Sequence, residues 1–327
     1  MIVLTGDHES ILGDIVARVR NYRGLRRKSP IGLTLPMFRF RRENVIAAKG
    51  EDAAIIRSGD RMLAFAADGI MHELVNINPR WAGYCSVLVN INDILAMNGY
   101  PLAAVNVISF KDAKIIEDLI KGVCDACSKF DVPMVGGHLH PDADCESIAV
   151  AMLGEIRGKK PLLSDSSRPG DRIVAICDCK GRFTPKIPYS WDCTSEKSRA
   201  TIKKNIEHLL SAMPFLTAGK DISNPGILGT LAMLLEASGV GATVDIERIP
   251  VPKGVDLLQW ITAYQGFGFI GTIRSKDINR VRDALEGTCV SVSVIGNITA
   301  DRKFNIRIGE SQRLLFDMSR EKITGLF

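Results

Sequence analysis

The sequence from Gly50 to Gly99, GEDAAIIRSGDRMLAFAADGIMHELVNINPRWAGYCSVLVNINDILAMNG, decides the fold. Two short apolar runs, 53–57 and 61–67, are joined by Ser58-Gly59-Asp60, which is typical of a hairpin turn. Asp52 precedes the first run and Asp68 follows the second, so an antiparallel hairpin brings both carboxylates to one end. Like charges at such range are costly unless a cation compensates them. The alternative is that both acids cap turns.

An apolar helix is predicted to follow the hairpin. It begins at Pro79, is apolar on almost all sides up to Met97, and is expected to end with Gly99 in the left-handed region. Asn92 and Asp93 therefore lie in a buried helix, where an ionised group must be paired or bind a metal. Because Mg²⁺ is usually held by one or two carboxylates and substrate phosphates, we hypothesise that Asp52, Asp68 and Asp93 meet at one Mg²⁺ beneath a nucleotide.

Length and composition restrict the classes of protein. A chain of 327 residues predicts two domains, and the Gly-, Pro- and Ser-rich segment 157–171 divides it into residues 1–160 and 161–327. A formal net charge of +5 is too small to indicate nucleic acid, so no nucleic-acid partner is predicted. Eight scattered cysteines without a secretory signal predict a cytoplasmic protein, and no apolar run is long enough to predict a membrane span.

A basic segment lies between the first predicted helix, residues 10–22 with Ser10 as its N-cap, and the hairpin. It contains Arg23, Arg26, Arg27 and Lys28. Such runs are often solvated surfaces. The alternative is an arm that closes over bound phosphates, and the sequence leaves both open.

Glycines follow the predicted strand at 132–135. In Gly136-Gly137-His138 the paired glycines allow backbone N–H groups to approach an anion closely, which predicts a phosphate loop. The downstream residues His140, Asp142 and Cys145 leave a zinc site as a weaker alternative, because ligands at alternate loop positions do not define a tetrahedral site.

The second half alternates predicted strands and helices, which favours an α/β fold. Asp221 is followed by Asn224-Pro225-Gly226 and then by an apolar helix at 227–238. Helix N-termini bind anions, and Asp221 would add a cation ligand beside the turn. A helix cap without a ligand explains the spacing equally well. A helix is also expected at 253–262.

These motifs, in order, resemble those of the superfamily of aminoimidazole ribonucleotide synthetase, selenophosphate synthetase, thiamine-monophosphate kinase and the hydrogenase-maturation carbamoyl dehydratase. Gly50-Glu51-Asp52-Ala53-Ala54 resembles its Gly-Asp-Asp-Ala-Ala element, and 92–97 its Asn-Asp-Ile-x-Ala-Met helix. Ala67-Asp68-Gly69, Gly136-Gly137-His138 and the segment from Asp221 to Gly229 are similar to its other motifs. Within the superfamily the chain looks closest to the methanogenesis marker 2 group.

The resemblance implies a two-domain α/β (α+β) fold, with an N-terminal mixed sheet and helices that form a dimeric barrel, and a C-terminal α/β sandwich. It implies a homodimer that binds ATP and Mg²⁺ in a cleft and activates an unidentified acceptor by kinase- or synthetase-type phosphoryl transfer. Carried over by position, the catalytic residues are Asp93 and Asp52, the metal ligands Asp52, Asp68, Asp93 and Asp221, and the cofactor-binding residues Gly50, Glu51, Asn92, Gly136, Gly137 and His138.

Two positions depart from the family pattern. Glu51 replaces an aspartate, and Asn224 stands where the kinase has a second aspartate, which should weaken a second Mg²⁺. These departures leave a second hypothesis open, in which the chain is an ATP-binding scaffold or maturation factor without turnover.

Overall fold

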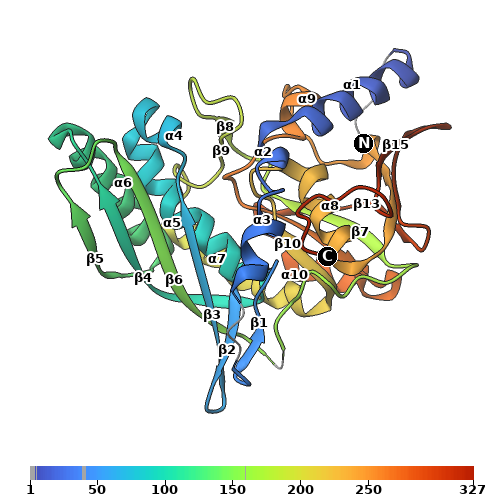
Figure 1. Ribbon diagram of the computed structural model, residues 1–327. Coiled ribbons are helices and arrows are strands. Elements are labelled where there is room, and N and C mark those ends of the chain that lie inside the picture. Colours follow the sequence, from blue (N-terminus) through green and yellow to red (C-terminus); the bar gives the residue numbers. More distant parts are fainter. Residues whose placement is uncertain (1–3, 5, 39–41, 159) are drawn as a thin grey trace.

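The computed structural model describes residues 4, 6–38, 42–158 and 160–327, so position 159 of the predicted linker lies outside the described residues. The chain forms two large sheets, each with helices packed against it (Figure 1). This arrangement confirms the predicted two-domain α/β fold class.

The first sheet has six strands in the order β1-β2-β3-β6-β4-β5. β4 and β5 are parallel and the other neighbours are antiparallel, which confirms the predicted mixed sheet. The strands are β1 (Val45–Ala47), β2 (Ala54–Ser58), β3 (Arg61–Gly69), β4 (Gly99–Ser109), β5 (Met134–His140) and β6 (Ser147–Ile156).

Helices cover one face of this sheet: α4 (His72–Ile77), α5 (Pro79–Ala96) and α6 (Ala113–Phe130). α5 lies between the sheet and the rest of the molecule, which is why it is apolar all round and buried along most of its length. It approaches α6 closely at Gly83 and Gly122. A Cβ on Gly83 would lie 2.0 Å from the carbonyl oxygen of Leu119, so no larger residue fits there.

The second sheet has seven strands in the order β10-β12-β7-β13-β11-β14-β15. They are β7 (Arg172–Cys177), β10 (Leu216–Asp221), β11 (Gly241–Asp245), β12 (Gly268–Ile273), β13 (Ser291–Thr299), β14 (Lys303–Ile308) and β15 (Ser311–Asp317). Its helices are α7 (Arg199–Ala212), α8 (Gly226–Ser238), α9 (Leu257–Trp260) and α10 (Ile278–Leu285), and β8 (Arg182–Phe183) pairs with β9 (Trp191–Asp192) apart from both large sheets. β10 is the edge strand that faces α5, so the two domains meet there.

The N-terminal helices lie against the second domain. α1 (His8–Asn21) packs on β15, where Arg20 donates a 2.6 Å hydrogen bond to the carbonyl oxygen of Leu315. α2 (Arg23–Arg26) follows and packs on α8, and α3 (Ile31–Thr34) continues toward the first sheet. The proposed division into residues 1–160 and 161–327 stays a prediction.

Several predicted element boundaries were wrong. Asp7, not Ser10, caps α1, because its side chain accepts the backbone N–H of Glu9. Asn98, not Gly99, takes the left-handed conformation after α5, with φ 62°, while Gly99 starts β4. The helix expected at 253–262 is only the short α9.

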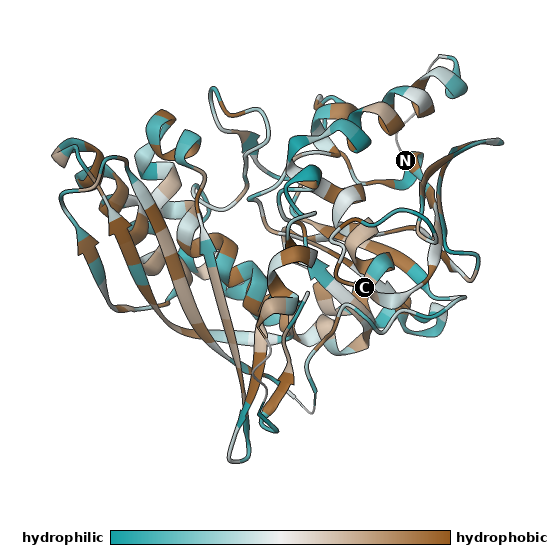
Figure 2. Cartoon of the chain, viewed as in Figure 1, coloured by the Kyte–Doolittle hydropathy of each residue, from teal (hydrophilic) through white to brown (hydrophobic). Residues whose placement is uncertain are grey.

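The face of the first sheet away from the helices carries exposed apolar side chains, and Figure 2 shows the apolar residues along these strands. Phe65 pairs with Leu153, and Val105 and Val107 of β4 continue the same face; all four are at least 36% exposed. The six-stranded sheet is open, so the predicted barrel is not formed by one chain. Among the described residues no helix is long and apolar enough to cross a membrane.

Candidate functional site

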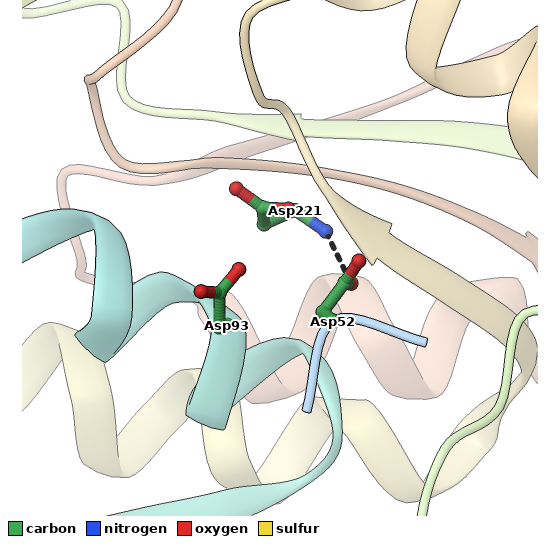
Figure 3. A group of neighbouring side chains, drawn as sticks. All are labelled: Asp52, Asp93 and Asp221. Carbon is green, nitrogen blue, oxygen red and sulfur yellow. Dashed lines mark hydrogen bonds between the residues drawn. The ribbon is translucent and has the colours of Figure 1, made fainter. Parts of the chain in front are cut away.

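Three carboxylates from distant parts of the sequence meet between the two domains (Figure 3). Asp52 precedes β2, Asp93 lies near the end of α5, and Asp221 is the last residue of β10. One carboxylate oxygen of each lies within 4.8 Å of the other two. The predicted convergence of acids is therefore present, but Asp221 takes the place that the central hypothesis gave to Asp68.

Asp52 is fixed by the second domain through both of its carboxylate oxygens. The backbone N–H of Asp221 donates to one oxygen at 3.1 Å, and the buried ammonium of Lys220 forms an ion pair with the other. Lys220 also donates to the carbonyl oxygen of Gly50 at 3.2 Å. Sequence reasoning missed Lys220, although a lysine inside an otherwise apolar strand beside Asp221 is a signal that it has a buried partner.

The three acids repel one another in a site of low solvent access. Burial first, and then the nearby carboxylates of Asp221, Asp68 and Asp52, raise the pKa of Asp93 well above its usual range. Burial and the charge of Asp52 likewise raise the pKa of Asp221. Asp93 also lies at the C-terminal end of α5, where the helix dipole disfavours a negative charge. A bound cation would offset the repulsion among these carboxylates.

The donor set fits a hard divalent cation. Mg²⁺ takes oxygen ligands and is held by one or two carboxylates, with water and phosphate completing its shell. Beside the acids, the side-chain N–H of Asn92 donates to the carbonyl oxygen of Gly266 at 2.8 Å, while its amide oxygen has no partner although Asn92 is buried. An unpartnered buried acceptor is a costly feature that a ligand with donors would satisfy.

A cleft open to solvent lies beside this cluster. Asp68, Asn92 and Asp221 line it together with Arg27 and Lys28 of the basic segment. Asp68 is thus a cleft residue close to Asp93, but it is not part of the three-carboxylate group. Arg27 and Lys28 of the basic segment therefore lie at the cleft, whereas Arg23 and Arg26 are exposed and do not line it.

Sequence reasoning also missed Gln265, which lines the same cleft. Its backbone is left-handed, with φ 68°, and its buried side-chain oxygen has no partner. The side-chain oxygen of Asn224, another cleft residue, is also unpartnered. Strained backbone and unsatisfied polar groups gather at ligand-binding sites, where a ligand completes the hydrogen bonding.

Glu51 contacts the interdomain linker. Its carboxylate accepts the backbone N–H of Ser164 at 3.0 Å. Burial raises the pKa of Glu51 from 4.5 to about 7, and the charge of Lys220 opposes that rise. Gly50 has φ +87° and packs against Leu326 and Phe327, where a Cβ would lie within 2.9 Å of both side chains. Both residues therefore position the loop that carries Asp52.

The predicted phosphate loop at Gly136-Gly137-His138 was wrong as a local structure, because these residues lie within β5. Gly137 is required by the neighbouring strand, since a Cβ would lie 2.1 Å from the side-chain oxygen of Asn106. β5 is three strands from β3, which is about 14 Å at the usual strand spacing. Within one chain, His138 is thus remote from Asp68.

The zinc alternative gains no support. His138 and His140 pack edge to face, with ring centroids 4.6 Å apart. Across the part of the chain that the structure describes, Asp52, Asp93 and Asp221 form the only group of three or more His, Cys, Asp or Glu residues arranged to bind a metal.

Known proteins share these domains. Residues 50–156 match the N-terminal domain of AIR synthase related proteins, and residues 189–309 match their C-terminal domain. An uncharacterized protein of Methanocaldococcus jannaschii is 39% identical, over 96% of this chain and 99% of its own length. The thiamine-monophosphate kinase of Buchnera aphidicola is 24% identical, over 85% of this chain and 92% of its own length.

A solved structure of T. maritima PurL complexed with ATP has the same fold. The TM-score is 0.70 at 20% sequence identity, and the match covers 82% of this chain. This chain spans less than half of PurL, 46% of its length. The chain belongs to the AIR synthase related protein family, which includes ATP-dependent enzymes. Its place in the methanogenesis marker 2 group stays a prediction.

Proposed function

We propose that the chain is an ATP-dependent enzyme that binds Mg-ATP in the cleft between its domains and activates an acceptor by phosphoryl transfer. The observation that carries the proposal is the meeting of Asp52, Asp93 and Asp221, whose oxygens lie within 4.8 Å of one another. Three carboxylates at a domain junction, two of them buried, are costly unless cations compensate their charge, and Lys220 supplies only one positive charge. A divalent cation and a polyphosphate explain both the cluster and the basic residues beside it.

The residues divide into two groups by charge. Asp52, Asp93 and Asp221 would bind Mg²⁺, which when bound neutralises the charge that develops on transferring phosphoryl oxygens. Lys28 and Arg27 line the same cleft and would bind phosphate oxygens directly. Positioning and charge neutralisation supply most of the catalysis in phosphoryl transfer, so no covalent nucleophile is needed from the chain.

Nucleotide binding and turnover are tested separately. We expect ATP to bind in the presence of Mg²⁺ and to bind much more weakly with EDTA, as measured by isothermal titration calorimetry. Release of ADP is then followed with candidate acceptors. Failure to bind ATP with Mg²⁺ would contradict the proposal.

The scaffold hypothesis keeps one specific support. Glu51, which replaces a family aspartate, directs its carboxylate to Ser164 of the linker and therefore to a contact between domains. Tight Mg-ATP binding without ADP release, with every acceptor and partner tried, would favour a non-catalytic ATP-binding scaffold or maturation factor.

We also propose that two chains form a homodimer through the open face of the first sheet. Phe65, Leu153, Val105 and Val107 form an apolar surface on that face, where water contact is unfavourable. The register between β4 and β5 places His138 beside Val107 on the same face. In such a dimer, the acid cluster around Asp52 of one chain and His138 of the other chain would belong to one assembly. The cofactor-binding role assigned to Gly136, Gly137 and His138 therefore requires the dimer.

A further inference from the structure

The buried ammonium of Lys220 lies beside the carboxylate cluster and contacts it through Asp52. Lys220 is 3% exposed, forms an ion pair with Asp52 and donates to the carbonyl oxygen of Gly50. A buried ammonium is costly unless its charge is paired and its hydrogen bonds are made. Asp52 itself is needed near Asp93 and Asp221, so the lysine and any metal ion share one carboxylate.

The net charge of the three carboxylates and Lys220 matches one divalent ion. Asp52, Asp93 and Asp221 together carry −3 when ionised, and Lys220 reduces this to −2, which one divalent ion balances. Two further acids lie close to the cluster. Glu51 accepts from Ser164, and Asp68, although near Asp93, also lies near Lys28, which offsets its charge. Asn224, another residue that lines the cleft, is neutral.

The hydrogen bonds of Asp52 restrict it further. One oxygen accepts from Lys220 and the other from the backbone N–H of Asp221. Each carboxylate oxygen has about two acceptor positions, so each retains about one. Each oxygen of Asp52 can therefore also contact a metal ion, but an ion at the oxygen that accepts from Lys220 would lie close to the ammonium.

We propose that Lys220 is a resident cation of the cluster, which positions Asp52 and limits each chain to one tightly bound divalent ion. The inference rests on the proposed Mg-nucleotide function. Lys220 is a positioning residue in this role, because it acts on the metal through Asp52. A second divalent ion at Asp52 would have to displace the ammonium or approach it closely, and like charges at that range repel strongly in a buried site.

The test counts metal ions in the full chain. Mn²⁺ replaces Mg²⁺, and electron paramagnetic resonance of free Mn²⁺ gives the number bound, with and without the non-hydrolysable analogue AMPPCP. We expect one tight Mn²⁺ per parent chain. Lys220→Met keeps the length of the side chain without its charge, and should bind a second Mn²⁺ or bind the first at least tenfold more tightly, whereas Lys220→Arg should match the parent.

Lys197→Met is the matched control. Lys197 forms an ion pair of 2.8 Å with the buried carboxylate of Asp178, and neither residue belongs to the cluster. This variant should leave Mn²⁺ binding unchanged. A folded Lys220→Met variant with the parent's number and affinity of Mn²⁺ ions would overturn the inference. If Lys220→Met does not fold, the parent chain still tests the inference, because two tightly bound Mn²⁺ ions per parent chain would overturn it. Absence of any Mn²⁺ binding to the parent would instead refute the proposed function.

Discussion

Replacing Glu51 by glutamine should change how the stability of the chain depends on pH. Glutamine keeps an oxygen that can accept the N–H of Ser164. It removes a carboxyl whose pKa rises, mainly through burial, from 4.5 to about 7. Because the folded chain binds this proton more tightly than the unfolded chain, the stability that Glu51 contributes is present below pH 4.5 and is lost as the pH rises to about 7.

The expected loss of stability follows from the rise in the pKa of Glu51 on folding. At roughly 1.4 kcal/mol per pH unit, the parent should lose up to about 3 kcal/mol relative to Glu51→Gln between pH 4.5 and 7.5. The value is an upper limit, since Lys220 and Asp52 lie close and can rearrange. Urea unfolding of metal-free protein at several pH values measures it. Glu310→Gln, in the exposed turn between β14 and β15, is the control and should show no such trend. A difference between parent and Glu51→Gln that is constant from pH 5 to 8 would refute the reasoning.

Four further predictions concern the site and the assembly. Asp93→Asn removes a buried charge, so it should fold at least as stably as the parent yet lose Mg²⁺-dependent ATP binding by at least tenfold in calorimetry. Metal binding must displace protons from acids with raised pKa values, such as Asp93 and Asp221, so the affinity for Mn²⁺ should fall as the pH is lowered. The released protons should make the binding enthalpy measured by calorimetry depend on the ionisation enthalpy of the buffer. Lys28→Gln should weaken ATP binding by about tenfold, in line with one charge-assisted hydrogen bond, without changing the number of Mn²⁺ ions. Phe65→Glu should give a monomer in light scattering, whereas Leu314→Glu, an equally exposed position on the second sheet, should leave the dimer intact.

Most of the fold could be predicted from the sequence because the pattern of apolar residues is strong. The helix α5 is apolar all round, and α6 has a clear apolar face, so their positions and burial were evident. The order of strands and helices gave the two α/β domains. Boundaries were less certain, since short caps such as Asp7 and Asn98 depend on local backbone geometry that several residues can adopt.

The composition of the acid cluster could be predicted only in part. Asp52 and Asp93 were correctly expected to meet, but the hairpin argument paired Asp52 with Asp68. In the structure the loop before β2 turns toward β10, where Lys220 and the N–H of Asp221 bind Asp52. That contact spans 168 residues and depends on how the two domains pack, which periodicity within one segment does not reveal.

The glycines of β5 show a second limit. A Gly-Gly pair can permit anion binding, or it can permit close approach between neighbouring strands. Gly137 serves the second purpose, because Asn106 of β4 occupies the space that a side chain would need. The sequence pattern is the same in both cases, and only the register of β4 and β5 distinguishes them.

The position of a bound metal ion tests the central claim most directly. Crystals of the full chain with Mn²⁺ and AMPPCP would give an anomalous difference peak for the manganese. We predict that peak between the carboxylates of Asp52, Asp93 and Asp221, with the phosphates of the analogue against it on the side of the cleft lined by Lys28. Manganese bound elsewhere, with these three carboxylates free of metal and phosphate, would contradict the account.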